Sequence, residues 1–391
     1  MEKTNNDYKI AVLFEGNIEK IRGEFTAIHN RVKELKKISS YVVDVFIFDT
    51  YFDNVTCFLK RITPKKRPKS FFFDGINYKC YWYKRSFIDY VYRIYVKNST
   101  SIEINRVCKY MNMFNEYDLL YTNSLKTGVL AYRLKKSLNI PFISLWHGSS
   151  IHTFPFKYKH IRKQTIKVLE NANINLFVSD ELYELAKNLT DNFKGQVSYN
   201  GIDTTVFKKY SIEEKVDLRK NYGINVEDKC VAFVGNCLPE KNVAYLPELF
   251  TELFKHIPKV SFYILGRGDF STLFDKCEFT IRNMEVLNTE MPLWYNCMDL
   301  IVMPSHKEGL PMTCLEATAC GTPFVGSRVG AIADVVGEQN TISHTDEFNK
   351  QFAKLCIQRL LERQDIILPS AFLLNFIVKK EKELIDSLLT K

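Results

Sequence analysis

Two glutamates, Glu308 and Glu316, flank a Gly-Leu-Pro turn in the segment SHKEGLPMTCLEATACGTP (305–323). Pro311 is typical of a helix start and Gly321 of a helix end, so the segment predicts a loop followed by a helix. The free amides at a helix start attract phosphate. Glu308 comes before that start and Glu316 more than one turn inside the helix, so the two carboxylates could bind hydroxyls on either side of a diphosphate.

A purely structural interpretation is also open for these glutamates. Glu308 could stabilise the helix through its dipole, and Glu316 could be a solvated surface residue. However, the helix around Glu316 carries Leu315, Ala317 and Ala319, which makes a solvated face less natural. The sequence therefore favours, without deciding, a binding role.

Two other loops in the same half follow strand-like runs and contain glycine. Gly235 ends the run before CLPEKN, where Lys241 could reach a phosphate, and Gly266 ends the run YIL before RGD. A lone GxG is weak, and no third glycine completes a dinucleotide-binding fingerprint. Glycines at consecutive strand ends nevertheless indicate close approach of the backbone to another group.

Together these motifs resemble the retaining glycosyltransferases of GT-B architecture, specifically glycosyltransferase family 4 (glycosyl transferases group 1). The resemblance covers nearly the whole chain and is most specific in EGLPMTCLEATACGTP (308–323). It implies that Glu308 faces the hydroxyls of the donor sugar and that Glu316 holds the ribose of the nucleotide. It also implies a metal-independent diphosphate site, whose donor-binding residues would be Gly23, Gly235, Lys241, Gly266, Gly309, Leu310 and Pro311.

The first half contributes a second motif, His147-Gly148, directly after the strand-like run ISLW. A single histidine after a strand is more often structural. The resemblance implies that His147 contacts the donor sugar near the reacting carbon, which makes His147 and Glu308 the candidate catalytic residues. One departure concerns the position after Gly235, where the family usually has arginine and this chain has Asn236.

Strand-like runs alternate with helix-like segments in both halves, which predicts an α/β protein with two Rossmann-like domains of parallel sheets facing a central cleft. We expect an N-terminal domain at 1–205, a linker at 206–228, a nucleotide-sugar-binding domain at 229–372, and a C-terminal helix at 373–391 that packs back on the first domain. Expected strands lie at 10–14, 42–48, 119–121, 142–145, 230–234, 261–265, 300–303 and 323–326, and expected helices at 27–37 and 128–138.

Charge is unevenly distributed between the halves. Residues 1–200 hold 32 basic and 19 acidic residues, whereas residues 201–391 hold 22 and 26. The densest basic stretch, Lys60–Lys69, precedes an aromatic-rich hairpin predicted to turn at Asp74-Gly75. This pattern favours an anionic membrane surface as a partner; a solvated loop is the alternative, and no nucleic-acid module surrounds it.

The ten cysteines show no paired spacing and are expected to be free thiols, mostly buried. No secretory signal is evident, so we expect a cytoplasmic protein, with peripheral attachment at the inner membrane face as the second option. The expected function is sugar transfer from a UDP- or GDP-linked donor to a glycan or polyprenyl-linked acceptor in bacterial surface polysaccharide synthesis, with no other cofactor. The alternatives are a sugar-nucleotide epimerase of the same architecture and a non-catalytic sugar-nucleotide or polysaccharide-binding protein.

Overall fold

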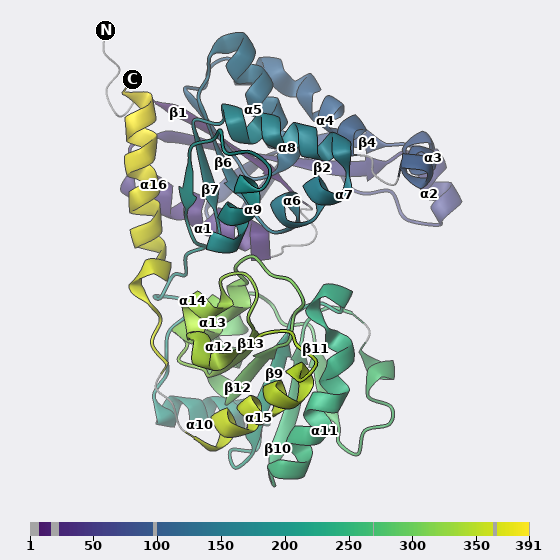
Figure 1. The fold of residues 1–391 in the computed structure, drawn as a ribbon, viewed down its shortest axis with the longest axis vertical. Coiled ribbons are helices and arrows are strands. Elements are labelled where there is room, and N and C mark those ends of the chain that lie inside the picture. The colour runs from purple at the N-terminus through teal and green to yellow at the C-terminus, as the bar shows by residue number, and fades with distance from the viewer. Residues whose placement is uncertain (1–7, 17–22, 97–99, 269, 363–365, 391) are drawn as a thin grey trace. The chain divides into compact units, whose positions relative to one another are not determined.

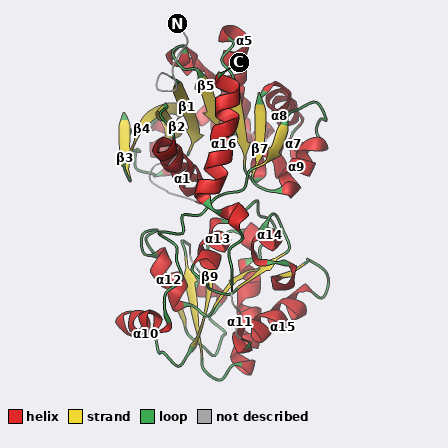
Figure 2. Ribbon diagram, turned by 90° about the vertical axis from the view of Figure 1, so that its left-hand side faces the viewer, coloured by secondary structure: helices red, strands yellow, loops and turns green. Residues whose placement is uncertain are grey.

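The structure, a computed structural model of residues 1–391, describes the whole chain except residues 1–7, 17–22, 97–99, 269, 363–365 and 391. The chain forms two compact units, one of Met1–Tyr199 with Ile377–Lys391 and the other of Asn200–Phe376. Each unit has its own sheet with helices on both faces (Figures 1 and 2). The predicted α/β class with two Rossmann-like units is confirmed.

In the described part of the first unit, the strands form a sheet in the order β3-β4-β2-β1-β5-β6-β7-β8. Only β3 runs antiparallel to its neighbour, β4. Strand β1 lies between β2 and β5, so the chain winds outward from it in both directions and leaves a crevice at the carboxyl ends of these strands. The strands are β1 (Lys9–Glu15), β2 (Val42–Phe52), β3 (Ser70–Phe73), β4 (Ile76–Arg85), β5 (Leu119–Thr122), β6 (Phe142–Trp146), β7 (Ile174–Phe177) and β8 (Gly195–Val197).

Helices connect these strands because each parallel crossover requires a segment that returns along the sheet. Ser124 shows how the sequence starts such a helix: it accepts a hydrogen bond from the Thr127 amide and caps α5. The helices are α1 (Gly23–Ile38), α2 (Asn54–Lys60), α3 (Phe87–Val96), α4 (Thr100–Val107), α5 (Leu125–Leu138), α6 (Ser149–His152), α7 (Phe154–Lys157), α8 (Lys159–Asn171) and α9 (Asp180–Lys187).

The C-terminal helix α16 (Leu374–Leu389) lies along the first unit from Ile377 onward (Figure 2). Arg31 of α1 forms a buried ion pair with Glu381 of α16. Tyr121 of β5 donates a hydrogen bond of 3.1 Å to the other oxygen of Glu381. Because both charges are buried, removing either one would leave its partner uncompensated, so this contact fixes how α16 packs on the unit.

The second unit has a parallel sheet in the order β11-β10-β9-β12-β13-β14 among its described residues. Here the chain winds outward from β9, which lies between β10 and β12. The strands are β9 (Lys229–Val234), β10 (Val260–Leu265), β11 (Ile281–Met284), β12 (Leu300–Met303), β13 (Phe324–Ser327) and β14 (Thr341–Ile342). The helices are α10 (Ile212–Asn221), α11 (Leu246–His256), α12 (Met291–Cys297), α13 (Met312–Ala319), α14 (Ile332–Val336) and α15 (Phe348–Leu361).

Every strand and helix expected from the sequence is present, with ends that coincide or differ by at most four residues. The hairpin prediction is also confirmed: Phe73 pairs with Ile76, and Asp74 and Gly75 between them have φ values of 42° and 80°. Two positive φ values in a two-residue loop suit the twist of the flanking strands. All ten cysteines are free thiols, and most are buried, as expected.

The expected linker at 206–228 differs from the structure. The second unit begins at Asn200, and the polar segment contains α10, whose start is capped by Ser211 and Glu214. Arg219 of this helix reaches Asp299, with Nη2 and Oδ2 2.7 Å apart, and also donates to the Cys297 carbonyl. The helix lacks an apolar face, so its attachment to the unit depends on these polar contacts and was not visible in the hydrophobic pattern.

Candidate functional site

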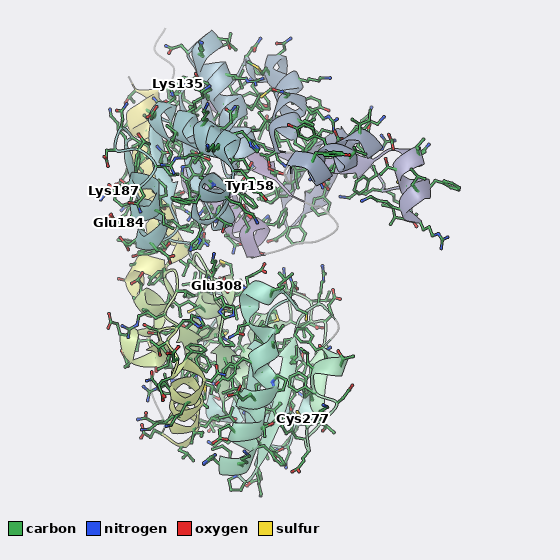
Figure 3. The ribbon with its side chains drawn as sticks, turned by 45° about the vertical axis from the view of Figure 1, so that its right-hand side comes forward. Lys135, Tyr158, Glu184, Lys187, Cys277 and Glu308 are labelled. Atoms are coloured by element: carbon green, nitrogen blue, oxygen red, sulfur yellow. The ribbon has the colours of Figure 1, made fainter. Side chains whose placement is uncertain are left out.

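Lys241 and Glu308 meet at the carboxyl ends of β9 and β12 in the second unit. These two strands are neighbours, and the chain reverses its winding direction between them, which is where ligands bind in such sheets. The Lys241 Nζ and Glu308 Oε1 atoms are 2.6 Å apart, and both side chains are largely buried. The His306 amide donates to the Glu240 carbonyl at 2.8 Å and holds the two loops together. Figure 3 shows Glu308 at this end of the unit.

The turn that follows Glu308 is fixed through its carbonyl groups. The Gly309 carbonyl accepts a hydrogen bond of 2.8 Å from the Ala331 amide, and the Leu310 carbonyl accepts one of 3.2 Å from the Asn200 side chain. Gly330 has a φ of +57°, and a Cβ atom there would lie 2.0 Å from the Gly309 oxygen. Only glycine therefore permits this approach, and the turn is held rigidly with its carbonyls facing the protein.

The amides of the same turn are available to a ligand. Within the described part of the chain, no hydrogen bond is donated by the amides of Gly309, Leu310, Met312 or Thr313. Pro311 occupies the position before the helix, with an extended ψ of 129°, and α13 begins at Met312 rather than at Pro311. Because Pro311 has no N–H, the unpaired donors on either side of it form the positive end of the helix, which suits a diphosphate.

Glu316 lies on α13 with its side chain half-buried, not fully solvated. The Tyr295 hydroxyl donates a hydrogen bond of 2.7 Å to its Oε2 atom. Burial raises the pKa of Glu316 to about 7, although the hydrogen bond from Tyr295 lowers it. No described residue donates to Oε1, so one carboxylate oxygen is available for a ligand hydroxyl.

Gly235 and Gly266 do not offer free amides. The Gly235 amide donates to the Leu265 carbonyl at 3.1 Å, and the Gly266 amide donates to the Met284 carbonyl at 3.0 Å. A Cβ atom on Gly266 would lie 1.8 Å from the Gly235 oxygen. The close approach inferred from the sequence is therefore between these two loops themselves, and the glycines shape the edge of the site rather than donate to a ligand.

A model of the family described as glycosyl transferases group 1 matches residues 228–362, which contain all the second-unit residues described above for this site except Asn200. Over these residues the second unit is similar to that family. TuaC of Bacillus subtilis, a glycosyltransferase provisionally assigned to teichuronic acid biosynthesis, is 30% identical over 222 residues, which are 56% of this chain and 56% of that protein. The chain thus spans a little over half the length of the curated relatives it matches first.

Solved structures extend the likeness to both units. HepE from Anabaena, solved with UDP and glucose, aligns with a TM-score of 0.72 at 18% identity and covers 96% of this chain and 99% of that one. Sucrose-phosphate synthase from Thermosynechococcus elongatus aligns with a TM-score of 0.70 at 14% identity, covering 98% and 99%. The chain therefore shares the GT-B fold of these structures, as predicted.

In the first unit, His147 directly follows β6, and Gly148 after it has a φ of +32°. The His147 Nε2 atom is buried and makes no hydrogen bond to a described residue. Burial and, to a smaller extent, the positive charge of Arg31 together lower the pKa of His147 to about 3. The imidazole is therefore neutral at physiological pH, with one unsatisfied nitrogen that could exchange a hydrogen bond with a hydroxyl. Its predicted contact with a donor sugar stays a prediction.

A cavity of about 380 Å³ lies at the carboxyl ends of β1, β2 and β4 in the first unit. Carboxylates and hydroxyls line it together with aromatic rings, and such polar groups fix the orientation of a small ligand in a pocket. Gly23, one of the expected donor-binding residues, lies at the first position of α1, next to lining residue Glu24; residues 17–22 before it lie outside the described residues. The lining residues include Glu15, Glu24, Asp49, Thr50, Tyr83 and Arg85.

A buried ionic network supports one wall of this cavity. The Lys126 ammonium contacts both Glu15 and Glu103, and Arg85 pairs with Glu103 at 2.8 Å. Burial acts to lower the pKa of Lys126, but these carboxylates and Tyr83 outweigh it and raise the pKa. Sequence reasoning missed the network because Glu103 and Lys126 lie on helices far from β1 in the chain. The available signal was Glu15, a charged residue directly after a buried strand.

Among the described residues, no group of three or more His, Cys, Asp or Glu side chains is arranged to hold a metal ion.

Proposed function

We propose that the chain transfers a sugar from a UDP- or GDP-linked donor to a hydroxyl of a glycan or lipid-linked acceptor, with retention at the anomeric carbon. The observation that supports this most is the arrangement at the ends of β9 and β12. There the Lys241–Glu308 pair, unpaired amides and the half-buried Glu316 belong to one loop cluster. A nucleotide sugar presents the matching groups in the same order: sugar hydroxyls, a diphosphate and a ribose.

The diphosphate is the leaving group in this reaction, and its charge grows as the bond to the sugar breaks. Lys241 and the amides of Gly309, Leu310, Met312 and Thr313 can stabilise that charge in place, without reorganisation during the reaction. Asn236 stands at the position after Gly235, where the family resemblance implies an arginine. Lys241 is consequently the main side chain that stabilises the charge of the diphosphate.

The two glutamates take different parts of the donor. Glu308 accepts hydrogen bonds from the sugar hydroxyls once the diphosphate competes for Lys241. Glu316 accepts from the ribose through its free Oε1 atom, while Tyr295 holds the other oxygen. In a front-face displacement the departing phosphate itself takes the acceptor proton, so the proposal assigns no protein nucleophile.

The acceptor is proposed to occupy the first-unit cavity, whose carboxylates and hydroxyls suit sugar hydroxyls and whose aromatic rings suit a sugar face. The name of TuaC favours a surface-polysaccharide acceptor, and the UDP and glucose bound to HepE favour a UDP-linked hexose donor. A role in bacterial surface polysaccharide synthesis follows as a proposal from these relatives.

The test is incubation of the full chain with nucleotide sugars and glycan acceptors, followed by nucleotide release and by assignment of the product anomer by NMR. We expect a product with the donor's anomeric configuration, and a loss of at least about a hundredfold in turnover for Glu308→Gln. Glu347→Gln, at an exposed position, is the matched control. An inverted product contradicts the retaining mechanism, and a free epimer formed without acceptor assigns the chain to the epimerases.

A further inference from the structure

Two short helices of the first unit, α2 and α3, follow neighbouring strands and lie together at one end of the unit (Figures 1 and 3). Helix α2 follows β2 and α3 follows β4, and at the ends of these strands Phe52 lies opposite Arg85. Lys84 of β4 pairs with Asp53, the capping residue of α2, at 3.0 Å. The two helices thus leave the sheet from the same edge.

Helix α2 exposes an apolar stripe. Its inner face is formed by the buried residues Thr56 and Cys57. Val55, Phe58 and Leu59 are 63%, 83% and 57% exposed. Residues at these spacings share one side of a helix, so the side that would ordinarily be polar is apolar here.

Helix α3 repeats the arrangement. Ile88 and Tyr95 are 75% and 82% exposed, and Tyr92 between them is 37% exposed. The spacing of four and then three residues places all three side chains on one face. We call Val55, Phe58, Leu59, Ile88, Tyr92 and Tyr95 the α2–α3 surface. Large apolar side chains gathered in this way mark an interaction site rather than ordinary surface.

A cation-rich segment follows the apolar stripe of α2 in the chain. Residues 54–73 contain six lysines and arginines and no aspartate or glutamate. Two of the cations are held against the unit: Lys65 pairs with Asp49, and Arg67 lies 4.3 Å from the centre of the Tyr51 ring. Arg61 caps the end of α2, and Lys66 and Lys69 lie further along the same segment; all three side chains are exposed.

We propose that the α2–α3 surface binds an anionic phospholipid bilayer, with its apolar side chains at the level of the acyl-chain boundary and the cations against the head groups. Apolar and cationic groups side by side match such an interface, where lysine and arginine attract anionic lipid. A second copy of the chain fits less well, because the same cations would face each other. None of the described helices is long and apolar enough to cross a bilayer, so this contact is one of adsorption.

The test is co-sedimentation of the full-length chain with vesicles of phosphatidylcholine alone and of phosphatidylcholine with phosphatidylglycerol. We expect binding to the anionic vesicles that weakens with salt. Phe58→Ser and Tyr95→Ser should each reduce the vesicle affinity about tenfold, because each removes a large apolar side chain from the interface. Lys66→Glu should reduce it about fivefold or more. All three positions are exposed, so folding is not at risk.

Matched controls are Leu287→Ser, at a position that is 68% exposed in the second unit, and Lys350→Glu, where the side chain is 84% exposed. Both should bind vesicles like the unaltered chain. The proposal is overturned if the chain does not bind anionic vesicles, or if Phe58→Ser and Tyr95→Ser bind as well as the controls. It is also overturned if these two substitutions instead dissolve a dimer seen by sedimentation, which would assign the surface to a second copy.

Discussion

Lys241 and Glu308 form an ion pair of 2.6 Å in the second unit, so two residues expected to bind different parts of a donor contact each other. Both side chains are largely buried, and neither charge could remain there without a partner at low cost. A bound diphosphate would contact the Lys241 ammonium, either together with Glu308 or in its place. Glu308 would then be free to accept hydrogen bonds from sugar hydroxyls.

This exchange predicts opposite effects of two substitutions on nucleotide binding. Lys241→Met should weaken the binding of a nucleoside diphosphate about tenfold or more, because a charge-assisted hydrogen bond is lost. Glu308→Gln should leave that affinity unchanged or increase it, because a negative charge near the diphosphate is removed, although sugar transfer falls. Titration calorimetry of the unaltered chain, Lys241→Met and Glu308→Gln measures the affinity of each for a nucleoside diphosphate. Equal weakening by both substitutions would contradict the exchange.

Donor binding should depend on pH through Glu316. With a pKa of about 7 in the free protein, this carboxyl is partly protonated at neutral pH, and ribose hydroxyls prefer the carboxylate. The affinity should therefore fall about tenfold between pH 8 and pH 6, because the proton must leave before the hydroxyls bind. Glu316→Gln should bind more weakly at pH 8 and lose the pH dependence. A slope that persists in Glu316→Gln would assign it to another group.

Glu316 should also lower the stability of the free protein above neutral pH. Burial raises its pKa from 4.5 in the unfolded chain to about 7, so the folded state binds the proton more tightly and loses stability as the pH rises between these values. Glu316→Gln should accordingly raise the free energy of unfolding at pH 8 by about 1–3 kcal/mol, and by less at pH 5. Denaturant unfolding at both pH values measures this increase in the free energy of unfolding. An equal increase at pH 8 and pH 5 would rule out ionisation of Glu316 as its cause.

His147 should contribute to transfer without titrating. Its pKa of about 3 keeps the imidazole neutral throughout the working range, so it can hydrogen-bond a sugar hydroxyl but cannot carry a charge. His147→Ala should lower kcat/KM about tenfold to a hundredfold, in line with one lost hydrogen bond to the reacting ligand. The pH–rate profile between pH 5 and 8 should keep its shape. If one limb of the pH–rate profile is lost in His147→Ala, the result would show that His147 ionises in the working range.

The first-unit cavity should determine acceptor affinity. Glu24 lines it from the exposed first turn of α1, so Glu24→Gln changes its hydrogen bonding with little risk to the fold. The KM for the acceptor should rise about tenfold, while the KM for the donor stays constant. Initial rates measured with each substrate varied in turn give the KM for the acceptor and the KM for the donor separately. Glu34→Gln, further along the same helix, serves as the control. If Glu24→Gln changes only the KM for the donor, the cavity does not bind the acceptor.

Local sequence patterns predicted the strands and helices because buried parallel strands have short, continuous apolar sequences, as in Ile10–Phe14 and Leu300–Met303. The loop between β12 and α13 was predicted equally well, since Pro311 and Gly321 mark the ends of its helix. These signals are local: each depends only on residues that are neighbours in the chain.

Contacts between distant residues could not be read in this way. The Lys241–Glu308 pair joins residues 67 positions apart, and the hydrogen bond from Asn200 to Leu310 joins residues 110 apart. The apolar stripe of α2 was missed for another reason. Its spacing is that of a helix packed in a core, and only the structure shows that this side of the helix faces outward.

The most direct test of the central claim is a thermal-shift measurement of the unaltered chain and of Glu316→Ala with a panel of nucleoside-diphosphate sugars. A ligand that binds only the folded state raises the melting temperature in proportion to its occupancy. We predict that one UDP- or GDP-linked sugar stabilises the unaltered chain by several degrees and gives little or no shift with Glu316→Ala. No shift with any nucleotide sugar, or an equal shift in both proteins, would contradict the claim that this loop cluster is the donor site.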